Sequence, residues 1–272
     1  MPFILLSILC SVIIGNALLL FSKGKKVDII IIFLGNYLLA SIFSFLQIRP
    51  GSFSVGPFEI LFGLFTGFCF LYNFIVYQKN ITINGLSLSV GVMRGAVVIP
   101  TFMSVLFFAD RISTFNFFGI LVILFAFWFI SEKNTIRKFI WLVVLFIISG
   151  VTDSTLKVYA ELGRPDQASF VFILFLAAFL FTLFWVWKTK RVITMKYFLF
   201  GLLLGIPNQL STRFFLWGLE TVPAPLAYPM TASSVVVLSI LSDILIWRKI
   251  FTPKQRLALV FLIIGIVLIN IR

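Results

Sequence analysis

The sequence predicts an all-α integral membrane protein in which ten transmembrane helices form two inverted five-helix repeats. Three observations indicate this fold class. Apolar stretches of membrane-spanning length follow one another along the chain, basic residues gather in every second connection, and the second half of the chain resembles the first. A bilayer core about 30 Å thick needs about 20 apolar helical residues to cross it. Since few residues remain outside such stretches, the function is expected to be carried out inside the bilayer.

Ten stretches are long and apolar enough to be these helices, and short connections separate them. The predicted spans are residues 3–21, 27–46, 57–77, 85–108, 114–130, 139–160, 168–187, 197–219, 226–247 and 256–270. Charged residues make up 11% of the chain, less than half of the share of about 25% in soluble proteins. The mean hydropathy is +1.15. The first stretch has neither a basic segment before it nor a small-residue cleavage site, so it is expected to be a retained helix.

Residue types that are absent or rare exclude several kinds of site. The chain has no histidine, which excludes Ser-His-Asp triads, histidine metal ligands and histidine proton relays. Cys10 and Cys69 both lie in predicted spans, so no disulfide or metal-binding framework is predicted. The chain also lacks the G-x-x-x-x-G-K-[ST] motif of ATP-driven proteins. We therefore expect no cofactor, no metal and no enzymatic activity.

The basic residues indicate the orientation of the chain in the membrane. Of the 22 Lys and Arg residues, most lie in the odd-numbered connections. Those in the even-numbered connections and at the chain ends are Arg49, Arg111, Arg164 and Arg272. Short loops that are rich in Lys and Arg stay in the cytoplasm. The odd connections are thus predicted to be cytoplasmic and both termini external, in a cell (inner or plasma) membrane. Because the net charge of +13 resides in these loops, it indicates topology control and no nucleic-acid partner.

The halves of the chain, residues 1–131 and 132–272, are predicted to be two copies of one five-helix unit. A shift of 139 positions places residues 85–130 on residues 224–269. Glycines four residues apart recur in the third and eighth spans, at Gly63, Gly67, Gly201 and Gly205. Such glycines let a neighbouring helix pack closely. Chance similarity of apolar sequence is the alternative. Because five spans per unit is an odd number, the halves must be inverted, an arrangement that builds transporter sites near the midplane.

At several positions the sequence resembles the EamA-like branch of the drug/metabolite transporter superfamily. The residues that carry the resemblance are Asp110-Arg111-Ile112-Ser113 with Gly119, Gly150-Val151-Thr152-Asp153 with Lys157, and Gly205-Ile206-Pro207-Asn208. The resemblance extends over essentially the whole chain. It implies a ten-helix carrier of small metabolites, amino acids or related solutes, with a central cavity lined mainly by helices 1, 3, 4, 6, 8 and 9. Members of this family usually have both termini in the cytoplasm, which differs from the orientation that the charges predict here.

Charged residues inside the spans are the main candidates for substrate binding, because a charge at mid-membrane costs about 2.5–3.5 kcal/mol. Arg94 lies beside Gly91 and Gly95, and its guanidinium suits a carboxylate or phosphate of the substrate. An ion pair with Asp153 is the alternative. Asp153 and Lys157 are four residues apart on one helical face, where they either line the cavity or pair with each other as a structural clamp. Lys157 can also extend its side chain to the membrane surface.

Further polar residues and three prolines complete the candidate site. The other predicted substrate-binding residues are Asn208, Arg213, Tyr228, Asn16 and Asn73. Hydrogen bonding between helices is the alternative role of the two asparagines in the first half, and anchoring at the membrane surface is that of the tyrosine. Asp243, near Arg248 at a span end, is expected to be structural. The predicted hinges or kinks are at Pro100, Pro207 and Pro229.

The function that these expectations indicate is secondary transport. The substrate would be a small polar or amphipathic metabolite, amino-acid-like or another solute with an anionic group, moved by alternating access. The alternative is a flippase or scramblase for a lipid or lipid-linked head group. The expected partners are this small molecule and membrane lipids, with the chain acting as a monomer or homodimer.

The charge distribution predicts the result of a labelling experiment. A single cysteine placed between Lys188 and Lys196, in a variant without the two native cysteines, should resist a membrane-impermeant maleimide in intact cells and react after permeabilisation. A cysteine placed in an even-numbered connection is the control and should react from outside. Labelling of the Lys188–Lys196 connection in intact cells would overturn the predicted orientation.

Overall fold

The structure is a computed structural model that describes residues 2–23, 27–48, 53, 55–108, 113–130, 136–163, 168–219, 221–222, 224–269 and 271. All regular structure in these residues is helical. The helices are α1 (Pro2–Lys23), α2 (Ile29–Leu46), α3 (Pro57–Asn84), α4 (Leu86–Gly95), α5 (Val98–Phe108), α6 (Thr114–Ile130), α7 (Ile136–Leu162), α8 (Ala168–Lys188), α9 (Met195–Leu219), α10 (Ala224–Leu245) and α11 (Pro253–Ile269). They match the ten predicted spans in order, with α4 and α5 together forming the fourth.

Six of these segments are at least 18 residues long and apolar enough to cross a membrane, counting α4 and α5 as one segment. The third span is longer than predicted. The sequence stops being apolar after Tyr77, but α3 continues to Asn84. The asparagines of this extension explain it, because Asn80 and Asn84 donate to the main-chain carbonyls of Trp141 and Lys138 on α7. Gly85, with φ of +87°, then ends the helix.

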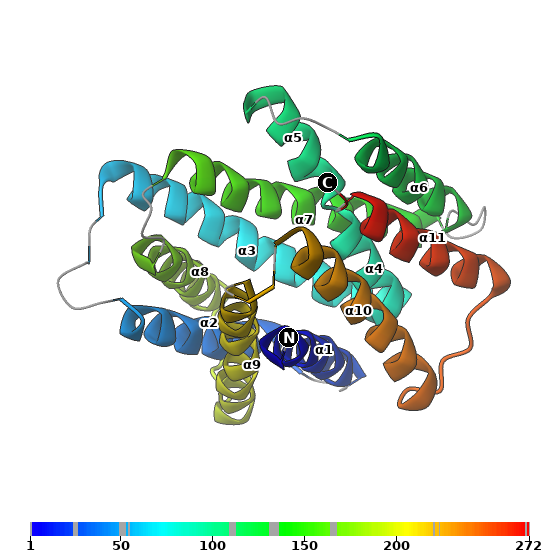
Figure 1. Ribbon diagram of the computed structural model, residues 1–272. Helices are drawn as coiled ribbons and strands as arrows, with labels where there is room; N and C mark the ends of the chain where they lie inside the picture. The colour runs from blue at the N-terminus through cyan, green and yellow to red at the C-terminus, as the bar shows by residue number, and fades with distance from the viewer. Residues whose placement is uncertain are drawn as a thin grey trace.

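Glycines bring distant helices into close contact. α2 packs along α9, α3 along α8, and α6 along α11 (Figure 1). A Cβ atom on Gly201 of α9 would overlap the main-chain oxygen of Ile32 on α2, and one on Gly67 of α3 would overlap the backbone of α8. In lipid, helix association depends on such close packing, since apolar surface gains little by leaving one apolar solvent for another. These glycines therefore hold the bundle together.

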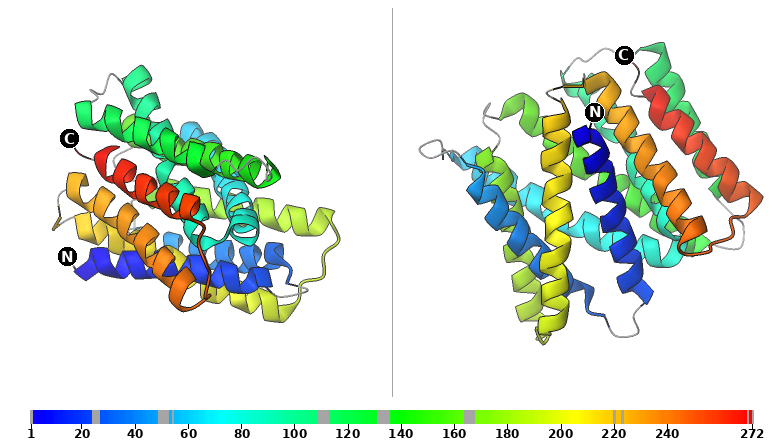
Figure 2. Two further views of the ribbon diagram at one scale, coloured as in Figure 1. Left: turned by 90° about the vertical axis from the view of Figure 1, so that its right-hand side faces the viewer. Right: turned by 60° about the horizontal axis from the view of Figure 1, so that its bottom comes forward.

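The two ends of the bundle differ in charge. The start of α1 and the end of α11 lie at one end, and the connection from α10 to α11 lies at the other (Figure 2, right). The latter end carries Lys23, Lys188 and Lys249, and we call it the basic end. Helices α4 and α7 both start there, so both run away from the basic end, α4 toward Arg94 and α7 toward Asp153.

The fourth span breaks at Ala96 and Val97, four and three residues before Pro100. In a continuous helix the residue at position 100 would donate its N–H to the Ala96 carbonyl, but proline has no N–H. Instead the N–H of Ile99 donates to the Ala96 carbonyl at 3.0 Å, a tighter turn that separates α4 from α5. Helix α9 continues through Pro207. Helix α10 continues through position 229, where the side chain of Pro229 lies outside the described part.

The close contact between α2 and α9 predicts an effect on stability. Gly201→Ala should lower the free energy of unfolding by about 1–3 kcal/mol, because the added methyl group cannot fit against the Ile32 carbonyl. Helix propensity alone would predict the opposite, a gain in stability, because it favours alanine over glycine. The measurement is unfolding in detergent micelles. Leu203→Ala, at a 61% exposed position on the same helix, is the control and should change stability by less than about 0.5 kcal/mol. Equal stability of the two variants would contradict the packing role.

Candidate functional site

A buried carboxylate joins α10 to the start of α4 at the basic end. Asp243 is 1% exposed, and it accepts hydrogen bonds from the Ser87 N–H at 3.0 Å and the Ser87 hydroxyl at 2.6 Å. Ser87 lies in the first turn of α4, where free N–H groups favour a negative charge. The ammonium of Lys249 lies 3.6 Å from the same carboxylate and donates to the Asn84 carbonyl at 2.9 Å. Burial lowers the pKa of Lys249, and the Asp243 carboxylate opposes this shift.

Further hydrogen bonds extend this cluster to α1. The side-chain amide of Asn16 donates to the Ser242 hydroxyl at 3.2 Å, and its oxygen accepts from the Trp247 indole at 2.8 Å. The Lys23 ammonium lies 3.9 Å from the centre of the Trp247 ring. We call the residues of these two clusters, with Asn80 and Asn84 on α3, the basic-end network. It ties α1, α3, α4, α7 and α10 together at that end of the bundle.

Two opposite charges farther along α4 and α7, away from the basic end, have no direct partners among the described residues. Arg94 is eight residues from the start of α4, or about 12 Å. Its Nε is buried without a hydrogen-bond partner, and its guanidinium forms no ion pair with any residue that the structure describes. Asp153 is nine residues from the end of α7 and is exposed, and its carboxylate also lacks a bond to the described residues. The two charges are close enough to interact electrostatically.

Comparison with known proteins identifies the family. Residues 136–271, half of the chain, match the EamA-like transporter family. The chain belongs to the EamA-like transporter family. It is accordingly a multi-pass membrane protein of a transporter family, as its apolar helices indicate. No curated protein matches it. A solved structure titled "Crystal structure of protein" is similar with a TM-score of 0.65 and 12% sequence identity, over 98% of this chain and 95% of that one. At this identity the likeness concerns the fold alone.

The structure of this EamA-like transporter does not contain the expected pair between Asp153 and Lys157. The Lys157 ammonium lies 2.6 Å from Glu161, one turn further along α7, and 5.9 Å from the centre of the Phe108 ring. Both carboxylates are four residues from the lysine, so sequence spacing does not distinguish them. Lys157 is near the end of α7, where a long side chain extends toward the membrane surface. This direction leads to Glu161 and leaves Asp153 unpaired.

Of the remaining predicted site residues, three asparagines bond to other helices, and Arg213 contacts an aromatic ring on its own helix. Asn16, in the basic-end network, and Asn73 bond to neighbouring helices, Asn73 accepting from the Ser149 hydroxyl of α7 at 2.8 Å. Asn208 donates to the Asn36 side chain of α2 at 3.2 Å. The guanidinium of Arg213 lies 4.6 Å from the centre of the Trp217 ring, also on α9. The side chain of Tyr228 lies outside the described part. None of these contacts joins Arg94 or Asp153.

Sequence reasoning missed the contact between Ser87 and Asp243. It expected a structural role for Asp243 beside Arg248, but the basic partner is Lys249. Ser87 gave no signal because a single serine two residues after a glycine is common in apolar helices.

The buried bonds of Asp243 predict a loss of stability when they are removed. Asp243→Ala should lower the free energy of unfolding by about 2 kcal/mol or more, because it leaves the Ser87 N–H without an acceptor and the Lys249 ammonium without its counter-ion. Arg191→Ala is the matched control. It breaks the ion pair with Asp28 at the same end, but both side chains are partly exposed, at 36% and 26%, so the cost should stay below about 1 kcal/mol. Chemical unfolding in detergent measures both. A smaller loss for Asp243→Ala than for Arg191→Ala would refute the role of the network.

Proposed function

We propose that this EamA-like transporter moves a small polar or amphipathic metabolite with an anionic group across the cell membrane by alternating access. The observation that carries the proposal is the unpaired guanidinium of Arg94. A buried donor without an acceptor costs about 1–3 kcal/mol, and a charged one inside a membrane costs more. A carboxylate or phosphate of a substrate would supply two parallel hydrogen bonds to it. The free energy that is lost by burying the guanidinium without an acceptor is thus recovered when substrate binds.

Asp153 supports a substrate that also carries hydrogen-bond donors or a positive charge. Its carboxylate is exposed and within electrostatic range of Arg94, so an anion at Arg94 would meet some repulsion from it. A zwitterionic, amino-acid-like solute avoids this repulsion, since its carboxylate can face Arg94 while its ammonium faces Asp153. Purely anionic solutes would bind more weakly at this position. No cofactor, metal or catalytic role enters this proposal.

The architecture of two inverted five-helix units, residues 1–131 and 132–272, is part of the same proposal. The close contact of α2 with α9 has a counterpart in that of α8 with α3, as exchange of the two halves requires. Gly201 of α9 and Gly63 of α3 belong to these equivalent contacts. The family match covers α7 to α11, the second unit. Inverted units commonly move against each other to expose a midplane site alternately to each side.

The basic-end network supports a conformation that is closed on one side. Its bonds join helices of both proposed units at the basic end, for example α4 and α10 through Ser87 and Asp243. If the basic end faces the cytoplasm, as the positive-inside rule favours, this conformation is closed to the cytoplasm. Transport then requires these bonds to break and a different set to form at the opposite end. The protein would work as a monomer or homodimer, driven by the substrate gradient or by a coupled ion.

We prefer transport of a solute to transport of a lipid head group. A flippase needs a polar path along which a head group can cross while its acyl chains remain in lipid. The groove between α3 and α8 opens on the outer surface, but its lining is apolar except for Lys188 and Thr189 at one end. The two unpaired charges within the spans, Arg94 and Asp153, lie on α4 and α7 and do not line this groove.

The role of Arg94 predicts how substitutions change ligand binding. A thermal-shift screen of the purified protein against metabolites would first find a stabilising ligand. Arg94→Lys should then weaken its binding, because the forked pair of hydrogen bonds is lost. Arg94→Ala should weaken it by about thirtyfold or more. Arg248→Ala, at an exposed position of the basic end, is the control and should bind as the wild type does. If Arg94→Ala fails to fold, Arg94 has a structural role. If it folds and binds the ligand as the wild type does, Arg94 does not hold the substrate.

A further inference from the structure

A groove lies between α3 and α8 on the outside of the helix bundle. It is nearer the basic end than the point where the two helices cross. The two helices touch where Gly63 and Gly67 meet the stretch from Ile173 to Ala178. Beyond this contact they enclose a groove of about 550 Å³. Its lining residues are Phe68, Leu71, Phe181, Phe184, Trp185, Lys188 and Thr189. Phe68 and Phe184 are 50% and 53% exposed. In a membrane protein such a surface faces lipid, so the groove is open to lipid molecules.

The groove is polar at one end only. From Phe181 to Lys188 it extends over seven residues of α8, or about 10 Å. The aromatic residues form the part that lies deeper in the membrane, and Lys188 and Thr189 form the part at the basic end. Trp185 lies between them, at the level where tryptophan commonly meets the head groups of a bilayer. An occupant with an apolar chain and one polar head matches this order of residues.

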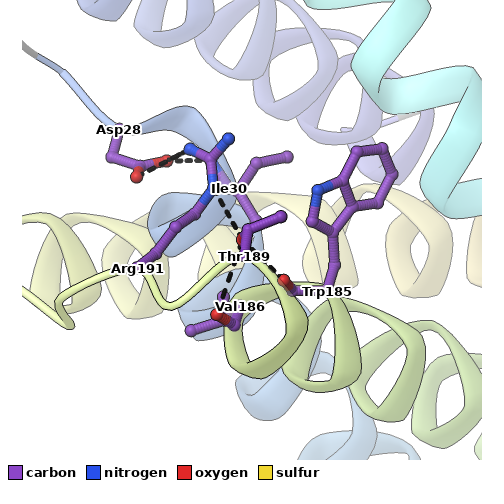
Figure 3. Close-up of polar contacts among 6 residues, drawn as sticks. All are labelled: Asp28, Ile30, Trp185, Val186, Thr189 and Arg191. Atoms are coloured by element: carbon purple, nitrogen blue, oxygen red, sulfur yellow. Dashed lines mark hydrogen bonds and ion pairs between the residues drawn. The ribbon is translucent and has the colours of Figure 1, made fainter.

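The charges around the groove favour a negatively charged head. The Arg191 guanidinium is already occupied, because it bonds both oxygens of Asp28 at 2.7 and 2.8 Å and donates to the Thr189 hydroxyl at 3.2 Å (Figure 3). Lys188 is exposed and forms no ion pair with any described residue. The N–H of the Trp185 indole has no acceptor among the described residues. Two donors, one of them cationic, are thus available at the head of the groove.

We propose that this groove binds one anionic phospholipid from the leaflet at the basic end. An acyl chain lies along Phe68, Phe181 and Phe184, and the phosphate accepts from Lys188 and the Trp185 indole. A second copy of the chain fits less well, because a two-fold symmetric contact through this face would bring two Lys188 ammonium groups together. The lipid contacts α3 and α8 together, which belong to different halves of the chain. Its binding therefore stabilises their contact and the arrangement of the whole bundle.

The experiment compares lipid binding to the full-length protein in detergent by native mass spectrometry. Equal amounts of phosphatidylglycerol and phosphatidylcholine, with the same acyl chains, are added. We expect one phosphatidylglycerol to be retained in preference, by about fivefold for one lysine near the surface. Lys188→Ala should abolish the preference, and Lys188→Glu should reverse it. Lys190→Ala removes the same charge from an exposed position outside the groove, so it should keep the preference.

A second measurement tests the location of the lipid. Phosphatidylglycerol with brominated acyl chains should quench tryptophan fluorescence, and part of this quenching should disappear in Trp185→Phe. The proposal is overturned if both lipids bind equally, or if Lys190→Ala reduces the preference as much as Lys188→Ala. It is also overturned if Trp185→Phe leaves the quenching unchanged, or if the protein forms a dimer that excludes the lipid. Each outcome is independent of whether a solute binds at Arg94.

Discussion

Close approach of helix backbones at glycine is the constraint on which the rest of this structure depends. Lipid is as apolar as the helix surfaces, so burial of phenylalanine or leucine gives little driving force for association. The contacts between α2 and α9, α3 and α8, and α6 and α11 instead rely on glycines such as Gly201, Gly67 and Gly119, where an added Cβ would overlap a neighbouring backbone. These three contacts fix the positions of the outer helices. Helices α4 and α7, which also pack against each other, carry the unpaired Arg94 and Asp153.

The polar residues of the bundle divide into a satisfied set and an unsatisfied one. At the basic end Asp243, Ser87 and Lys249 bond to one another and to the backbone. About 12 Å along α4, Arg94 has no such partner. A protein that only needed stability would gain by pairing Arg94 or by replacing it with an apolar residue. This difference in hydrogen bonding is the physical basis of the proposal, in which the basic-end network closes one end and Arg94 binds the substrate.

The two sets are placed so that they can influence each other. Arg94 and Ser87 lie on the same short helix, and the break at Ala96 and Val97 separates α4 from α5 immediately after Arg94. In the proposed transport cycle this short helix, capped by Asp243 at one end and broken at the other, shifts as a unit. Movement of α4 would change the position of Arg94 and the bonds of Ser87 together, which is how binding at one site would be coupled to opening of the basic end.

The sequence by itself determined the number, order and approximate limits of the helices, because about 20 apolar residues in a row have few other structures available in a bilayer. It also identified Arg94 and Asp153, since a charge in an apolar stretch is visible without a structure. It did not determine partners. Lys157 is equally distant in sequence from Asp153 and Glu161, and only the direction of its side chain selects Glu161. Likewise, only helix packing brings Ser87 to Asp243, 156 positions apart, because contacts between helices depend on tertiary geometry that local periodicity does not encode.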